Sequence, residues 1–229
     1  MAEQRVSNER KKELGQVDPF QESLLKAARY AKEYKKPLIL ITGAIVVAAM
    51  VFSGIMYNFH KAEDTASILV DHALTKYANV KDPVKGYLAC KNDFQTIFAD
   101  YANTTAGRLA KVKFAKICYE ASKFDQSYKY YKQSLETFKD KALVENFILA
   151  SLGHVSLARK DFESAKKYFL QIEKGQTDLL KDEARFALAM LYKANNNTAE
   201  SKKMYEKIVT EYGNSIYRPI AKSKIDAMK

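Results

Sequence analysis

The strongest pattern in the chain is one uninterrupted run of uncharged, mostly apolar residues near its start. The 21 residues from Pro37 to Tyr57 contain no charged side chain, and Lys61 is the first charged residue after them. A helix of this length rises about 31 Å, close to the roughly 30 Å hydrocarbon core of a bilayer. A cleaved signal peptide is the alternative, but its apolar core is usually shorter and an A-x-A cleavage site is missing here. The pattern predicts a transmembrane helix over residues 37–57.

Basic residues are distributed unevenly on the two sides of this run. Residues 17–36 carry five lysines or arginines, whereas residues 58–77 carry two. Because the more basic flank of a membrane span usually stays in the cytoplasm, we expect a cytoplasmic N-terminus. Residues 58–229 then lie on the far side, which in a bacterium is the periplasm. The chain is predicted to be a single-pass protein of the bacterial inner membrane.

The segment before the span, residues 1–36, divides into two parts. Residues 1–17 are polar without an apolar period, which predicts a disordered tail. A helix is predicted to start at Asp18, followed by a first-turn proline, because apolar residues then recur at helical spacing. This helix either lies on the inner leaflet or forms a charged stalk. Its apolar positions are Phe20, Leu24, Ala28 and Ala31.

Beyond the span, the pattern predicts helices only. Apolar residues recur with a period near 3.6, and helix-capping or turn residues separate the segments. The predicted helices cover residues 61–79, 84–102, 105–122, 125–139, 141–159, 162–174, 178–194, 198–212 and 216–228. Residues 58–229 are therefore expected to form an all-α domain.

Within this domain a pattern of small, apolar and aromatic residues repeats three times. Ala115, Gly153 and Ala189 occupy equivalent places, 38 and 36 residues apart. Around them the copies read Phe114, Ala115, Tyr119, Phe124, Ser127, Tyr131, Ser134; then Leu152, Gly153, Leu157, Phe162, Ala165, Phe169, Ile172; then Leu188, Ala189, Tyr192, Ser201, Tyr205, Ile208. The small residue allows two helices to approach closely, and the aromatic residues fill the space between successive pairs.

These segments resemble tetratricopeptide repeats, although residues 61–102 match the pattern only in their last helix. The resemblance implies a solenoid of helix pairs whose first helices line a concave groove. By similarity to the groove positions of that family, a peptide or protein partner would contact Val112, Lys116, Tyr119, Ala150, His154, Leu157, Phe186, Met190 and Lys193. Some of these residues would instead belong to the core between repeats. The expected fold class is all-α, with a single N-terminal transmembrane helix followed by a tetratricopeptide-like solenoid.

The whole layout is similar to that of the YfgM-like ancillary subunits of the bacterial Sec translocon. That resemblance implies an anchored interaction module that links the translocon to periplasmic chaperones or substrates, with membrane proteins or periplasmic polypeptides as partners. Two alternatives remain: an anchored receptor whose repeats face the cytosol, and an envelope scaffold whose repeats self-associate. The sequence does not identify the partner or the oligomeric state.

Composition adds no sign of catalysis, cofactor binding or nucleic-acid binding. The net charge is +11, but the lysines are interspersed with acidic residues. They either attract anionic lipids or acidic partners, or form a solvated helical surface. No nucleophile and base, metal-ligand spacing or phosphate-binding loop is present, so we predict neither an enzyme nor a cofactor. Cys90 and Cys118 sit on apolar helix faces, where free buried thiols are favoured over a disulfide.

Overall fold

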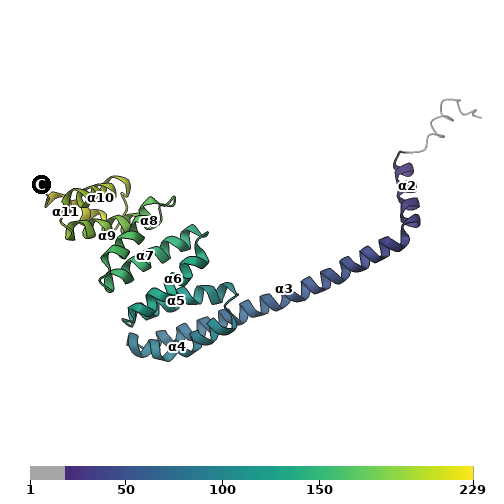
Figure 1. Ribbon diagram of the computed structural model, residues 1–229, viewed down its shortest axis with the longest axis horizontal. Coiled ribbons are helices and arrows are strands. Elements are labelled where there is room, and N and C mark those ends of the chain that lie inside the picture. Colours follow the sequence, from purple (N-terminus) through teal and green to yellow (C-terminus); the bar gives the residue numbers. More distant parts are fainter. Residues whose placement is uncertain (1–18, 229) are drawn as a thin grey trace, which may run out of the picture. The chain divides into compact units, whose positions relative to one another are not determined.

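The computed structural model describes residues 19–228, and every regular element among them is an α-helix. The helices are α2 (Pro19–Glu33), α3 (Lys35–Ala78), α4 (Pro83–Asp100), α5 (Thr105–Glu120), α6 (Phe124–Phe138), α7 (Ala142–Ala158), α8 (Phe162–Lys174), α9 (Lys181–Ala194), α10 (Thr198–Glu211) and α11 (Arg218–Asp226). The all-α prediction is confirmed. The predicted disordered tail lies outside the described residues. The chain divides into two units at Asn58, and each is described by itself (Figure 1).

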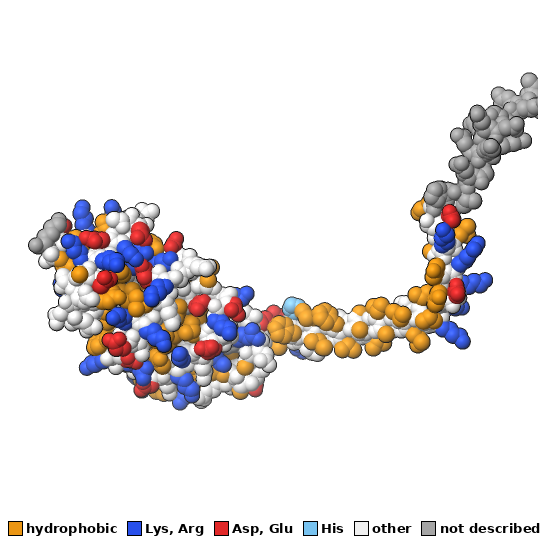
Figure 2. All heavy atoms as spheres, turned by 45° about the horizontal axis from the view of Figure 1, so that its top comes forward, with side chains coloured by type: hydrophobic (Ala, Val, Ile, Leu, Met, Phe, Trp, Pro, Cys, Tyr) orange, Lys and Arg blue, Asp and Glu red, His pale blue; other side chains and the backbone are white. Residues whose placement is uncertain are grey.

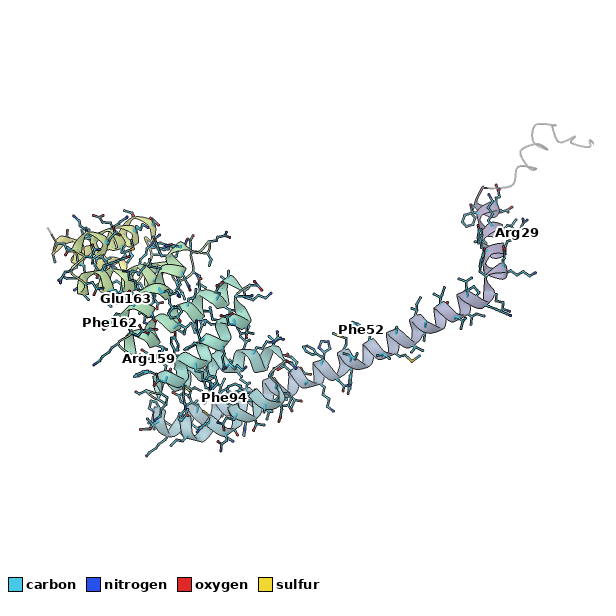
Figure 3. All side chains as sticks on the ribbon, viewed as in Figure 1. Arg29, Phe52, Phe94, Arg159, Phe162 and Glu163 are labelled. Atoms are coloured by element: carbon cyan, nitrogen blue, oxygen red, sulfur yellow. The ribbon has the colours of Figure 1, made fainter. Side chains whose placement is uncertain are left out.

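The first unit contains α2 and the apolar part of α3. Within the described residues, α3 is the one helix long and apolar enough to cross a membrane, with a mean hydropathy of 2.6 over its most apolar 18 residues. None of that window is buried. Figure 2 shows apolar side chains along this part of the helix, and Figure 3 labels one residue of it, Phe52. The helix is thus a candidate membrane span.

The structure corrects the prediction of two separate helices over 37–57 and 61–79. Both segments belong to the single helix α3. No proline or glycine occurs between Gly54 and Ala78, so nothing in the backbone ends the helix after the apolar run. The change from apolar to polar side chains therefore does not coincide with a helix boundary.

The second unit is a stack of antiparallel helix pairs, α5 with α6, α7 with α8 and α9 with α10 (Figure 1). Each helix packs against its neighbours along the chain, and α11 packs on α10. From 84 onward the predicted boundaries agree with the structure to within three residues. The largest error is at α9, which begins at Lys181 because Leu180 before it has a left-handed backbone. This unit is a helical-repeat domain.

The repeated small residues lie where the helices of each pair approach most closely. Ala115 and Ala189 are fully buried, and their carbonyl oxygens accept hydrogen bonds of 2.8 Å from the hydroxyls of Ser127 and Ser201, respectively. In the middle pair, Gly153 is packed against the ring of a buried phenylalanine, Phe169 on α8. The close approach that the sequence predicted at these three positions is confirmed.

The same turn joins the two helices of each pair. Ser122, Lys160 and Asn196 follow the first helix with positive φ values of 57°, 62° and 59°. In each turn two backbone N–H groups return to the last helical turn, which is the Schellman arrangement. In each turn one of these hydrogen bonds joins residues five apart in sequence: the N–H groups of Lys123, Asp161 and Asn197 donate to the carbonyl oxygens of Cys118, Ser156 and Tyr192, respectively. Glycine and asparagine are the residues that most often adopt the left-handed conformation. Here asparagine occupies one of the three turns, and serine and lysine occupy the other two.

Residues 61–102 form a further helix pair, made by the end of α3 and by α4. Phe94 of α4 (Figure 3) is fully buried, with its ring 4.9 Å from that of Phe114 on α5. Cys90 and Cys118 lie in the same core as free thiols. Burial raises the pKa of Cys90 to about 11 and that of Cys118 to about 12. Both therefore remain protonated and unreactive at neutral pH.

A carboxylate of α3 caps the next repeat. The two side-chain oxygens of Glu63 each accept a 2.7 Å hydrogen bond, from the backbone N–H groups of Thr105 and Ala106 at the start of α5. These groups have no partner within their own helix, and a negative charge is favoured at a helix N-terminus. Glu63 therefore ties the end of α3 to the first complete repeat.

We expect Glu63→Gln to destabilise residues 59–229 by about 1–2 kcal/mol, because the amide can accept only one of the two hydrogen bonds and carries no charge. Asp64→Asn is the matched control, since Asp64 is the exposed neighbour of Glu63. Urea denaturation of both variants measures the difference. Equal stability losses would contradict the capping role.

Candidate functional site

The candidate site is a hollow of about 290 Å³ between the first helices of successive pairs, which we call the central hollow. It is lined by Lys116, Tyr119, Tyr131, Phe147, Ala150, Ser151, His154, Val155, Leu180 and Glu183. These residues come mainly from α5, α7 and the start of α9. Because α5 and α7 are in direct contact, their outward-facing residues form one surface.

Two aromatic side chains are exposed in the central hollow. Phe147 is 45% exposed, and Tyr119 is 37% exposed with its ring 5.6 Å from that of Phe124. Between them Tyr131 is buried, and burial raises the pKa of its hydroxyl to about 12. The exposed Lys116 also lines the hollow and lies 3.7 Å from the carboxylate of Glu120, one turn along α5. The hollow therefore offers apolar contact area beside charged groups, a combination suited to a polypeptide.

A polar pair crosses the hollow from α7 to α9. Nε2 of His154 lies 2.6 Å from Oε1 of Glu183, a hydrogen bond in which the ring nitrogen donates. The imidazole also meets the buried ring of Phe169 edge-on, with ring centres 5.4 Å apart. The hydrogen bond to Glu183 and the ring contact with Phe169 thus restrain the orientation of the His154 side chain in the hollow.

A second hollow, the distal hollow, lies between the end of α7, the start of α8 and the end of α9. Its volume is about 320 Å³, and its lining is Leu157, Phe162, Ala187, Met190, Leu191, Ala194 and Asn195. Phe162 (Figure 3) is 51% exposed and Met190 is 48% exposed. The lining is almost wholly apolar, and methionine adapts to irregular partners. Figure 2 shows apolar side chains interspersed with basic and acidic side chains on one face of the repeat unit.

The structure distributes the nine predicted groove residues over four kinds of place. The central hollow contains Lys116, Tyr119, Ala150 and His154. The distal hollow contains Leu157 and Met190. The core contains Val112, which is buried, and Phe186, which is partly buried and stacked on Tyr217 with ring centres 4.8 Å apart. Lys193 is exposed and lines neither hollow.

Three prominent lining residues were not predicted. Phe147 lies one helical turn before Ala150 and Ser151 and two before His154, so its spacing on α7 could have revealed it. Phe162 was assigned only to the packing between helices, but half of its surface is open. Glu183 had no signal in the sequence, because its place depends on how α9 packs beside α7.

An ion-pair network centred on a buried arginine joins α8, α9 and α10. Arg185 of α9 is 5% exposed, and its guanidinium donates hydrogen bonds to Glu173 of α8 and Glu211 of α10. Lys207 donates a further hydrogen bond of 2.6 Å to Glu173. Burial would raise the pKa of Glu173, but the hydrogen bonds from the two cations outweigh burial and hold that pKa below its usual value. The network is structural, since Arg185 is not accessible to a ligand.

No cluster of three or more His, Cys, Asp and Glu side chains in the described range 20–228 is arranged to hold a metal ion. The titratable groups of the two hollows are a lysine, a tyrosine, a buried tyrosine and the histidine–glutamate pair. The two hollows offer apolar, aromatic and charged groups that could contact another polypeptide.

The chain belongs to the tetratricopeptide repeat-like domain family, whose model matches residues 29–229. Helical repeats of this type are typically non-catalytic scaffolds that bind other proteins. No curated protein sequence matches the chain significantly. A similar solved structure is the crystal structure of BtubC (BKLC) from P. vanneervenii, with 17% sequence identity, coverage of 93% of each chain and a TM-score of 0.45.

Proposed function

We propose that this protein is a membrane-anchored interaction module that binds a polypeptide along the central and distal hollows. The observation that carries the proposal is the exposure of Tyr119, Phe147 and Met190 on the first helices of three successive repeats. Large apolar side chains that face solvent in one region mark interaction surfaces. A peptide with apolar anchors, extended or helical, would fill both hollows.

The proposed topology places residues 1–36 in the cytoplasm, residues 37–57 in the bacterial inner membrane and residues 58–229 in the periplasm. The exposed apolar part of α3 and the five-to-two excess of basic residues on its N-terminal side support this arrangement. The finer role, linking the Sec translocon to periplasmic chaperones or substrates, is supported by the similarity of the layout to the YfgM-like subunits. The competing roles are the cytosol-facing receptor and the self-associating scaffold.

The topology predicts which engineered cysteines react in intact spheroplasts. A membrane-impermeant thiol reagent should label a cysteine at Asn195, in the turn before α10, and should spare one at Ser7. The native Cys90 and Cys118 are buried and should not react. Labelling of Ser7→Cys with protection of Asn195→Cys would reverse the orientation and favour the cytosol-facing receptor.

The binding surface is tested by a photo-cross-linking amino acid at Met190, in the distal hollow, in living cells. Cross-links to a polypeptide should form there and should weaken about tenfold or more when Tyr119 and Phe147 are both changed to alanine, since truncating one buried anchor costs about 1–4 kcal/mol of binding. Both substituted residues are exposed enough for the fold to survive.

The same probe at Lys203, on the exposed face of α10, is the matched control. Equal cross-linking at Met190 and Lys203, or cross-links at Met190 that survive the double alanine change, would exclude the hollows as the binding surface. Cross-links from Met190 only to a second copy of this chain would favour the scaffold.

A further inference from the structure

Helix α2 has one side whose side chains are mostly apolar and exposed. Apolar residues recur along it at intervals of four, three, four and three, which places them on one face of a helix. We call this face the apolar stripe; it consists of Phe20, Leu24, Ala27 and Ala31 of α2 and of Tyr34, which directly follows α2. Leu24 is 56% exposed, and Tyr34 stacks on the neighbouring Tyr30. A soluble helix would bury such a face against a partner.

The rest of α2 and the first residues of α3 are strongly cationic. Residues 19–36 contain five basic and two acidic side chains, a net charge of +3. One lysine, Lys26, forms an ion pair of 2.9 Å with Glu22. Arg29 (Figure 3), Lys32, Lys35 and Lys36 have no acidic partner within salt-bridge distance among residues 20–228. By helical spacing, Lys32 and Lys35 lie to the sides of the apolar stripe at the end nearest the candidate span, whereas Arg29 lies opposite the stripe.

A proline at the third position of α3 accounts for the break between α2 and α3. Pro37 has no N–H group to bond to the carbonyl of Glu33, and its ring crowds that carbonyl. The regular helix is accordingly interrupted at Tyr34, between Glu33 and Lys35. Proline kinks of this kind let two helical segments take different directions. Thus α2 need not follow the axis of α3 into the bilayer, where its charged side would be costly.

We propose that α2 binds flat on an anionic lipid surface, with the apolar stripe at the boundary of the acyl chains and the lysines on headgroup phosphates. Charge complementarity selects this occupant, because lysines that have no acidic partner among residues 20–228, beside an apolar stripe, match anionic headgroups above hydrocarbon. Tyrosines such as Tyr30 and Tyr34 also favour the membrane interface. The inference rests on the proposed anchoring of α3, which holds α2 at the bilayer.

The test uses the full-length chain, reconstituted into vesicles, with one spin-labelled cysteine at a time. The labels replace Leu24 on the apolar stripe, Glu22 on the opposite side as the matched control, and Val47 in the apolar run. Collision rates with dissolved oxygen and with a water-soluble nickel chelate report the surroundings of each label. One set of vesicles is pure phosphatidylcholine, and the other contains about 30% phosphatidylglycerol as the anionic lipid.

In anionic vesicles we expect the nickel collision rate at Leu24 to be severalfold lower than at Glu22, with the oxygen rate higher. The difference should shrink in pure phosphatidylcholine and in the variant Lys32→Glu/Lys36→Glu. A water-accessible Leu24 beside a lipid-exposed Val47 overturns the proposal, makes α2 a charged stalk and leaves the anchoring intact. An equally protected Leu24 in both vesicle types overturns the anionic surface as the occupant. Water access at both Leu24 and Val47 overturns the anchoring and this proposal together.

Discussion

Replacing Gly153 by leucine should destabilise the repeat unit by about 3 kcal/mol or more, because it overpacks the closest helix contact in the molecule's middle repeat. A Cβ atom at this position would lie 2.5 Å from Cζ of Phe169. That ring is fully buried on α8, so it cannot swing into solvent. The two helices of the pair must separate, and thermal unfolding of residues 59–229 should show a markedly lower Tm.

Gly213→Leu is the matched control, since no atom lies within 4 Å of a Cβ placed on Gly213. It should leave the Tm nearly unchanged. Shortening the opposing ring should compensate in part: Phe169→Leu alone destabilises, but in combination with Gly153→Ala it should cost less than the two separate changes added together. Strict additivity of the two changes would show that α7 and α8 do not touch where the structure places them.

Arg185→Met should destabilise the same unit by about 3 kcal/mol, because it removes one member of a buried ion-pair network. Glu173 is left with Lys207 as its cationic partner, in a site where its side chain is 10% exposed. Glu211→Gln is the control at the exposed end of the network; its side chain is 49% exposed, and the change should cost less than about 1 kcal/mol. Denaturant unfolding of both variants measures the difference.

The loss caused by Arg185→Met should depend on pH. In the wild type, burial opposes ionisation of Glu173, but hydrogen bonds from Arg185 and Lys207 keep its pKa below the usual 4.5. The resulting stability is fully present above pH 4.5 and is lost as the pH falls through the lower pKa of the folded protein. The two proteins should therefore differ most near neutral pH and converge in acid. A difference that is constant with pH would mean that Arg185 stabilises through packing alone.

Much of the fold could be predicted because local signals agree with the packing. Turn and cap residues separate nearly every helix from the next, and the small residues Ala115, Gly153 and Ala189 mark the closest helix contacts. The continuity of α3 was missed because a change from apolar to charged side chains was taken for a boundary that the backbone does not have. The left-handed backbone at Ser122 and Lys160 could not be predicted, because neither position is a glycine or an asparagine. Asn196, in contrast, lies in a run of asparagines, which is typical of a turn.

The site was harder to predict than the fold, because it depends on contacts between residues far apart in sequence. Phe186 is apolar and on a first helix, as a groove residue should be, but the packing of α11 places Tyr217 against it. Arg185 would be assigned to the surface by its charge, and it is buried because its partners arrive from two other helices. The spacing of residues along one helix does not contain this information.

Because the three turns have the same backbone conformation, the number of helix pairs in this solenoid can change while the turns between helices stay the same. Ser122, Lys160 and Asn196 share one backbone conformation at intervals of 38 and 36 residues, and each is followed by the start of a second helix. A cut at one of these positions and a join at the next removes or adds a whole helix pair without changing the geometry of the junction. Gene duplication or protein engineering could therefore alter how many residues of a bound polypeptide the repeats span.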